Sequence, residues 1–472
     1  MIYAGRYWAE INPSLPQIPY GRIVYEWKLL KFAAESCKWS LDRIISEEPG
    51  FEQFFNPREL LSGGFGGTDN LHYGLYDQSR YWDWELSSGA AGTGPSILKR
   101  VETSELPSLG AFVRSWRDGD LPHEEFRATL KRLGADPLAV DVVLTSPEDE
   151  APDAGRWMSS DLPGMYRREH ASLVFRSDTT TVVVDPQVLS GTWTTNHGRY
   201  PAGDLTRRVD AVLITHHHQD HWHIPSILYL TRPDTPVIVP DVPRPNMLCW
   251  ERFTDTLAAV GQAAIVGEWD STITVGDIEI DVLPFRGEQP TKYAPGPPPD
   301  LRNWGNCYRI NTPHFSAVIL ADSGVDPTGD ICPSLEASVK KRGPVDFLLC
   351  NCRTFPEGIN MGNPHYSLAL PFDRLQQIFA DREKGRIESM TLGPSGIAGA
   401  CAAAQARYFL PYAQGFRGIG VDPVGDPSEA SILAEVEEEM RHRSPGTQVT
   451  GWYPGSSVTL DARGRLLERA FA

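Results

Sequence analysis

A run of histidines and one aspartate follows an apolar stretch near the middle of this chain. Residues 215–221 read Thr-His-His-His-Gln-Asp-His, and residues 209–214 before them read Val-Asp-Ala-Val-Leu-Ile. The apolar stretch predicts a buried strand, so the polar side chains after it converge at the mouth of a sheet. Imidazole and carboxylate groups are the usual protein ligands of zinc, iron and manganese. The run therefore predicts two adjacent metal ions that share one short loop.

The spacing H-x-H-x-D-H in this loop resembles the signature of the metallo-β-lactamase fold superfamily. The resemblance implies that His216 and His218 face one metal ion. Asp220 and His221 would then face the other. The two remaining histidines of the region do not fit the spacing, and we interpret them as packed or solvated side chains: His217 and His223.

Length and composition predict a large protein with two domains. The chain has 472 residues, of which 41% are hydrophobic and 22% are charged, as in ordinary globular proteins. An acidic, proline-containing stretch at residues 146–155 reads as a linker. We therefore predict an N-terminal α+β domain over residues 1–160 and a catalytic domain over residues 161–472.

The charge balance argues against broad classes of partner. A formal net charge of −17 disfavours general binding to nucleic acid or to an anionic membrane. The pair Arg167-Arg168 is a candidate basic patch, but solvated surface is the simpler interpretation. Seven scattered cysteines and the lack of a leader or membrane-spanning run favour reduced thiols and a cytoplasmic location. The pair Cys350 and Cys352 is interpreted as buried rather than metal-binding.

Local patterns predict several elements. Apolar spacing predicts helices over residues 25–47 and 123–133. Residues 71–86 are rich in aromatic side chains, which could line a substrate entrance or an interface, although core packing is the simpler interpretation. Strands alternate with helices in the second half of the chain, which predicts two sheets flanked by helices, an αββα sandwich. The predicted strands are residues 180–185, 211–215, 236–240, 278–283, 317–321, 346–350 and 389–392.

Further candidate ligands lie where predicted strands end. In the superfamily, a histidine normally follows the strand that here leads into Pro284, but this chain has Glu288. Asp322 occupies the usual place of the carboxylate that bridges two metals, and His365 offers a last imidazole. Asp185 is in position either to orient the ligand loop or to cap a turn, and both interpretations stay open.

The resulting set divides between two metals. The proposed ligands of one ion are His216, His218 and Glu288. The proposed ligands of the other ion are Asp220, His221 and His365, and Asp322 would lie between the two ions. Three carboxylates make this shell more anionic than a histidine-rich dizinc site. Negative charge stabilises oxidised iron, so the set favours an iron pair, although zinc also accepts glutamate.

The loop and Glu288 together resemble the dinuclear non-haem iron β-hydroxylases, the family typified by the β-hydroxylase of chloramphenicol biosynthesis. The resemblance covers the loop at 215–221, Glu288, Asp322 and His365, in that order. It implies a metallo-β-lactamase-fold monooxygenase in which Glu288 and Asp322 are catalytic, with two iron ions, O2 as co-substrate and an external electron donor. The implied substrate is an amino acid tethered as a thioester to a nonribosomal peptide synthetase carrier domain in antibiotic biosynthesis. The family also suggests a homodimer.

Other functions are compatible with parts of the pattern. A dizinc hydrolase of the same fold, such as a lactonase, phosphodiesterase or amide hydrolase, would use every proposed ligand except Glu288. A flavodiiron oxygen reductase is disfavoured, because that group normally carries a glutamate where this loop has His218. A purely structural metal site would not need so many polar ligands.

Overall fold

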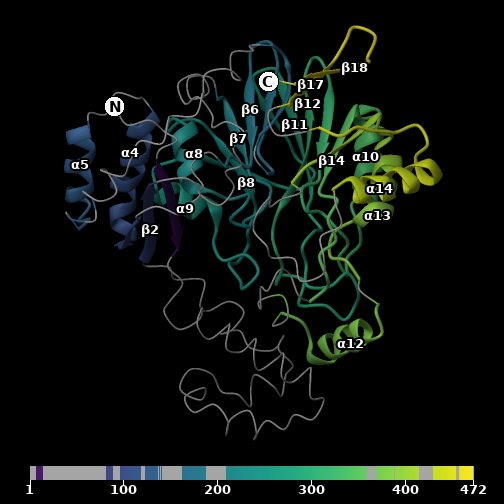
Figure 1. Ribbon diagram of the computed structural model, residues 1–472, viewed down its shortest axis with the longest axis horizontal. Helices are drawn as coiled ribbons and strands as arrows, with labels where there is room; N and C mark the ends of the chain where they lie inside the picture. The colour runs from purple at the N-terminus through teal and green to yellow at the C-terminus, as the bar shows by residue number, and fades with distance from the viewer. Residues whose placement is uncertain are drawn as a thin grey trace, which may run out of the picture.

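Two large β-sheets form the centre of the molecule in the computed structural model (Figure 1). The structure describes residues 7–13, 81–88, 96–117, 123–136, 162–168, 170–187, 209–358, 369–386, 388–413, 429–452 and 456–470, with the single positions 138, 140 and 366. The predicted helix over residues 25–47 and the predicted boundary near residue 160 lie outside these ranges.

The first sheet has eight strands in the order β18-β17-β4-β5-β6-β7-β8-β9. Its central strands are short and buried on both faces, as the apolar runs predict. Their bounds are β4 (Gly164–Arg167), β5 (Leu173–Arg176), β6 (Thr181–Val184), β7 (Ala211–Leu213), β8 (Val237–Pro240), β9 (Ala264–Gly267), β17 (Ser456–Leu460) and β18 (Leu466–Ala470).

The second sheet has seven strands in the order β10-β11-β12-β13-β14-β15-β16. Strands β10 to β13 pair antiparallel, and β13 to β16 pair parallel. Their bounds are β10 (Thr272–Val275), β11 (Ile278–Pro284), β12 (Asn306–Asn311), β13 (Ser316–Ile319), β14 (Phe347–Cys350), β15 (Tyr408–Pro411) and β16 (Gln448–Val449).

Buried apolar side chains from both sheets form one cluster between them. Val184 and Leu213 of the first sheet belong to it together with Val282 and Ile319 of the second. Fully burying an aliphatic side chain contributes roughly 1.5–3 kcal/mol, so this interface holds the sheets face to face. The packed sheets therefore hold the ends of β7, β11 and β13 in fixed relative positions.

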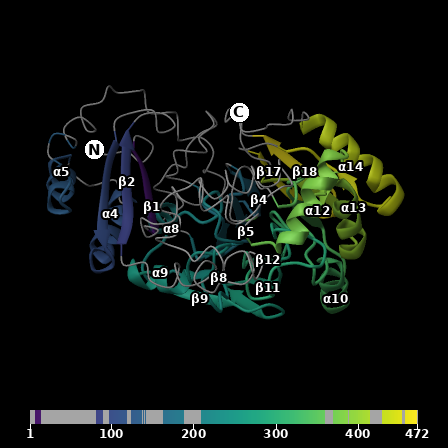
Figure 2. The same cartoon turned by 90° about the horizontal axis from the view of Figure 1, so that it is seen from below.

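Helices cover the outer faces of both sheets. On the second sheet lie α10 (Cys332–Arg342), α13 (Gly393–Ala404) and α14 (Glu429–Arg443), and on the first lie α8 (Ile224–Leu230) and α9 (Phe253–Ala259). Figures 1 and 2 show these two groups on opposite sides of the sheets. Helix α12 (Phe372–Glu383) lies below α13 and α14 in the view of Figure 1. The predicted αββα sandwich is confirmed. No helix in the described ranges is both long and apolar enough to cross a bilayer.

The described N-terminal elements pack against the outside of α8. A small sheet of β1 (Tyr7–Pro13), β2 (Tyr81–Ser88) and β3 (Ser96–Glu102) is followed by α4 (Leu106–Arg117) and α5 (His123–Arg132). The prediction of a helix from residue 123 is confirmed. Trp82 and Trp84 are buried in a core cluster that continues into α8. The simpler interpretation of this aromatic stretch, core packing, is confirmed for these two tryptophans, so they do not line a substrate entrance.

Two sequence predictions were wrong. Residues 389–392 form no strand, because Met390 N–H bonds to the Phe355 carbonyl and Leu392 N–H bonds to the Ser323 carbonyl, so the segment bridges loops. Arg167 is buried rather than solvated, since its guanidinium donates to the carbonyl of Trp452 at 2.5 Å. Arg168 is buried as well.

Candidate metal centre

The histidine loop begins at the end of β7, where the chain leaves the core. The Thr215 carbonyl accepts a hydrogen bond from Asn306 N–H at 2.7 Å, and His216 forms a bridge with Gly305. These contacts attach the start of the loop to β12 of the opposite sheet. The start of the loop is therefore attached to both sheets, which fixes the backbone that carries its ligand-type side chains.

Asp185, at the end of β6, orients this loop. Its carboxylate accepts from Thr215 N–H at 2.8 Å and from the Thr215 hydroxyl at 2.6 Å. The same carboxylate lies 2.8 Å from His221 Nδ1. A proton on Nδ1 directed at a carboxylate leaves the lone pair of Nε2 available to a metal. Of the two interpretations of Asp185, the structure supports orientation of the ligand loop.

His216, His218 and Glu288 form the first cluster of ligand-type atoms. His216 Nε2 lies 3.1 Å from His218 Nδ1 and 3.4 Å from Glu288 Oε2. Glu288 Oε2 also contacts His218 Nδ1 directly. The structure thus places Glu288 beside the two histidines with which the sequence pattern grouped it.

Backbone geometry brings Glu288 to this position. Glu288 adopts the left-handed conformation with φ of 48°, which turns the chain sharply after β11. The preceding residue has no room for a side chain, because a Cβ on Gly287 would lie 1.9 Å from the Asp322 carbonyl oxygen. Glycine at position 287 therefore allows the loops that carry Glu288 and Asp322 to pack against each other.

Asp322 lies between two histidines, as expected for a bridging carboxylate. Its Oδ2 is 2.9 Å from His221 Nε2 and 3.8 Å from His216 Nε2. Its other oxygen accepts a hydrogen bond from the Asn351 side-chain amide at 2.5 Å. Asn351 follows β14 and was not among the predicted site residues. This hydrogen bond fixes the rotation of the Asp322 carboxylate.

Asp220 and His221 form a further cluster with His170. Asp220 Oδ2 lies 3.6 Å from His221 Nε2 and 2.8 Å from His170 Nε2. The sequence pattern did not identify His170, because it belongs to a turn between two strands and has no spacing relation to the loop.

The chemistry of these atoms fits metal ions. Burial, reinforced by the charges of His221 and His218, holds the pKa of His216 well below its usual value, so this ring is neutral at neutral pH. Burial opposes ionisation of Asp220, but His221 and His170 outweigh it and hold its pKa well below the ordinary value. Burial opposes protonation of His221, but Asp220 and Asp322 outweigh it and hold its pKa well above the usual value, so a proton offsets their charge when no metal ion is bound. Metal ions would displace such protons, because the lone pairs of imidazole nitrogens and carboxylate oxygens repel at these distances unless a cation or proton lies between them. The residues therefore suit two cations.

His365 lies outside the described residues, so its role stays a prediction. Its chain neighbour Tyr366 is described, is buried, and places its hydroxyl 2.9 Å from His218 Nε2. Tyr366 was also missed, since an aromatic residue after a histidine carries no spacing signal. The contact would orient the His218 ring with Nδ1 toward Glu288.

The remaining histidines of the region have structural partners. His217 Nδ1 lies 3.2 Å from Asn303 Oδ1, and His223 caps the start of α8. His314 sits in the turn before β13, 2.8 Å from Asp178. The interpretation of His217 and His223 as packed side chains is consistent with these contacts. Cys350 and Cys352 are buried, and burial raises the pKa of the Cys350 thiol well above its usual value.

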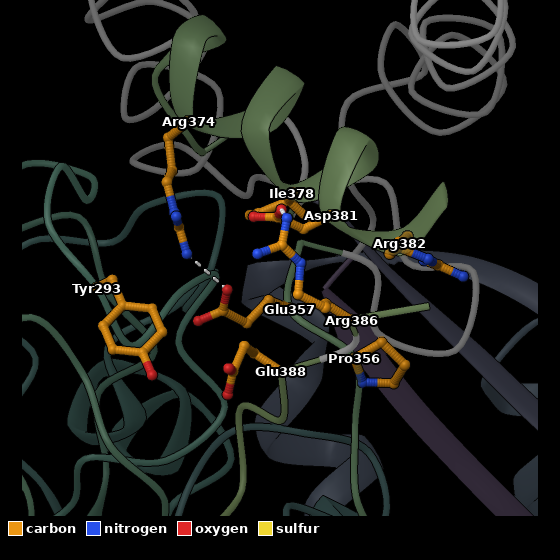
Figure 3. Close-up of a pocket in the computed structure, with 9 residues that line it drawn as sticks. All are labelled: Tyr293, Pro356, Glu357, Arg374, Ile378, Asp381, Arg382, Arg386 and Glu388. Atoms are coloured by element: carbon orange, nitrogen blue, oxygen red, sulfur yellow. Dashed lines mark hydrogen bonds and ion pairs between the residues drawn. The ribbon is translucent and has the colours of Figure 1, made fainter. Parts of the chain in front are cut away.

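A polar pocket lies beside α12 (Figure 3). Part of its lining comes from the loop that follows Glu288, and part comes from the loop that precedes residue 359. Glu357 is buried there and pairs with Arg374 at 2.7 Å. Its other oxygen accepts from Lys292 N–H at 2.7 Å. None of the candidate ligands lines this pocket, and its central carboxylate is neutralised by an arginine.

Comparison with known proteins agrees with this description. Residues 180–411 match the β-lactamase superfamily domain. A curated relative from Streptomyces venezuelae, 4-amino-L-phenylalanyl-(CmlP-peptidyl-carrier-protein) 3-hydroxylase, is 32% identical over 121 residues. That match spans 25% of this chain and only 23% of the relative.

Solved structures extend the likeness over the whole chain. The crystal structure of CmlA, a diiron β-hydroxylase from Streptomyces venezuelae, matches with a TM-score of 0.59 at 16% identity and covers 99% of both chains. A mutant of the CmlA β-hydroxylase matches with a TM-score of 0.58 at 16% identity, over 98% of this chain and 99% of that one. At this identity, the likeness establishes a shared fold.

Proposed function

We propose that the protein, whose residues 180–411 are a metallo-β-lactamase-fold domain, is an oxygen-dependent diiron monooxygenase. The proposed reaction is β-hydroxylation of an amino acid held as a thioester on the carrier domain of a nonribosomal peptide synthetase, in natural-product biosynthesis. An external donor would supply the electrons. The proposed metal ligands are His216, His218, Asp220, His221, Glu288, Asp322 and His365.

The observation that carries the proposal is the position of Glu288. The residue is 3% exposed, and its carboxylate contacts both His216 and His218, where the superfamily pattern has a further histidine. A carboxylate adds a full negative charge and a hard oxygen donor to this cluster. Both changes favour iron over zinc, because they offset the charge of oxidised iron. A dizinc hydrolase does not need this offset, because zinc keeps one oxidation state.

The protein residues have distinct parts in the proposed reaction. When bound, a reduced iron pair supplies the ability to reduce O2 and oxidise a C–H bond. Glu288 and Asp322 both place a carboxylate oxygen near His216 Nε2, at 3.4 and 3.8 Å, and would supply negative charge to the two metal ions. Asp185 and Tyr366 fix the rings of His221 and His218. The side chains of His216, Glu288 and Asp322 are buried, which limits the access of bulk water to that side of the centre.

The proposed partner is an aminoacyl carrier domain. Support comes from the curated relative, whose name specifies an aminoacyl group on a peptidyl carrier protein. Because the matched segment is a minor part of that relative, the amino acid that this protein would hydroxylate is not transferred from it. A panel of aminoacyl carrier domains is the appropriate set of substrates.

Metal content tests the proposal. We expect protein purified after expression with both iron and zinc available to hold an iron pair, measured by elemental analysis of the native chain. The reason is the anionic donor set that includes Glu288. The matched control is a variant with histidine at this position, Glu288→His, which should shift the content toward zinc. Stoichiometric zinc without iron in the native protein would support the hydrolase instead.

A further inference from the structure

A buried histidine outside the ligand loop contacts the proposed metal centre. His170 lies in the turn between β4 and β5, with 6% of its surface exposed and φ of 48°. The turn is closed by a hydrogen bond from Arg168 N–H to the Ser172 carbonyl at 2.8 Å. The His170 carbonyl also accepts from Ala413 N–H at 3.3 Å, which ties the turn to the end of β15 in the other sheet. The backbone of His170 is thus held from both sheets.

The ring of His170 is directed at the metal-facing carboxylate of the loop. Its Nε2 lies 2.8 Å from Asp220 Oδ2, a hydrogen-bonding distance. The ring packs edge-on against His221, with centroids 5.3 Å apart and planes at 75°. Since an ionised carboxylate only accepts hydrogen bonds, the proton must be on His170 Nε2. This nitrogen then has no lone pair to offer a metal.

Asp220 needs such a partner more than the other carboxylates do. Its side chain is 18% exposed, whereas those of Glu288 and Asp322 are 4% exposed. Asp322 is already fixed from behind by Asn351. An aspartate on a short loop with access to water can rotate away from a metal unless one oxygen is held. His170 supplies the corresponding restraint for Asp220.

We propose that His170 is a positioning residue of the metal centre, which orients the Asp220 carboxylate toward the second metal position by donating a hydrogen bond from Nε2. The inference rests on the proposed dimetal site, but it does not depend on oxygen chemistry or on the substrate. Partners that orient a ligand typically contribute roughly 10–100-fold to metal affinity.

Binding of Fe2+ to the metal-free full-length chain under anaerobic conditions tests this role. We expect His170→Ala to weaken the second binding step roughly 10–100-fold and to leave the first step unchanged. Mössbauer spectra of the iron-loaded variant should show one altered iron site and one native site. His170→Gln should recover most of the affinity, because its amide nitrogen can donate from nearly the same position.

The structure offers a matched control. His314 makes the same type of contact with Asp178, also at 2.8 Å, but on the surface and away from the centre. His314→Ala should leave both binding steps and both Mössbauer sites unchanged. Circular dichroism of each metal-free variant separates loss of folding from loss of binding.

If the His170→Ala variant folds, either of two results would overturn the inference. Native affinity and spectrum in a folded His170→Ala variant would mean that His170 only packs. Equal loss in His170→Gln and His170→Ala would mean that the imidazole is itself a ligand. If His170→Ala does not fold, native-like affinity in His170→Gln supports the inference and a tenfold or larger loss contradicts it. Failure of the proposed function would look different, since the native chain would bind two ions yet hydroxylate nothing.

Discussion

Glu288→Gln is expected to lower the rate of hydroxylation by more than roughly 100-fold. Removal of a residue that only supports a ligand typically costs roughly 10–100-fold, and removal of a ligand should cost more. The substitution keeps the shape of a residue that is 3% exposed, but it removes the charge and the anionic metal ligand beside His216 and His218. We expect the folded variant to retain iron at the second position, since Asp220, His221 and Asp322 are unchanged. Turnover with an aminoacyl carrier substrate and iron per chain are the two measurements.

Another buried glutamate provides the control for this experiment. Glu357 is also 3% exposed, but it pairs with Arg374 in the pocket beside α12 rather than with histidines (Figure 3). Glu357→Gln should lower stability, because it leaves the Arg374 charge poorly compensated, and should leave the iron content of the folded protein unchanged. Full hydroxylation activity in Glu288→Gln would contradict the assignment of Glu288 as a ligand.

Asp322→Asn is expected to disturb both metal positions. Asp322 Oδ2 lies against His221 Nε2 at 2.9 Å and faces His216 Nε2 at 3.8 Å, so one oxygen serves both clusters. An amide is a weaker donor than a carboxylate and brings no charge to offset two cations. We therefore expect iron content to fall at both sites and hydroxylation to reach background. The contrast with Glu288→Gln, where one iron stays, is the specific expectation.

Asp326 is the matched control for Asp322. It lies in the same loop region, is equally buried at 3% exposed, and pairs with Arg302 at 2.6 Å. Asp326→Asn should destabilise the fold through the unpaired arginine, while the folded fraction should bind iron as the native chain does. Retention of both irons by Asp322→Asn, shown by elemental analysis, would remove the bridging role.

Much of the architecture and of the candidate site could be predicted from local sequence patterns. Strands such as β6, β8 and β14 are short, fully buried runs, and their apolar composition and flanking turns are visible without tertiary information. The ligand-type residues follow such strands, which is why the loop at 216–221, Glu288 and Asp322 could be grouped before their contacts were known. The structure brings all of these described residues together.

Long-range contacts explain what the sequence did not predict. Strands β17 and β18 complete the first sheet from the C-terminal end of the chain, a pairing that no local pattern encodes. His170 and Asn351 act only through contacts with Asp220 and Asp322, and neither has a spacing relation to the loop. The arginine at position 167 looked solvated because its buried carbonyl partners come from residues far along the chain.

Oxygen incorporation is the most direct test of the proposed activity. The iron-loaded native chain is reduced without air, mixed with a panel of aminoacyl carrier domains, and exposed to labelled O2. The proposal predicts that one carrier-bound amino acid gains the mass of a single labelled oxygen atom at its β-carbon, and that Glu288→Gln gives none. A native protein that holds an iron pair but incorporates no labelled oxygen into any member of a broad panel would contradict it.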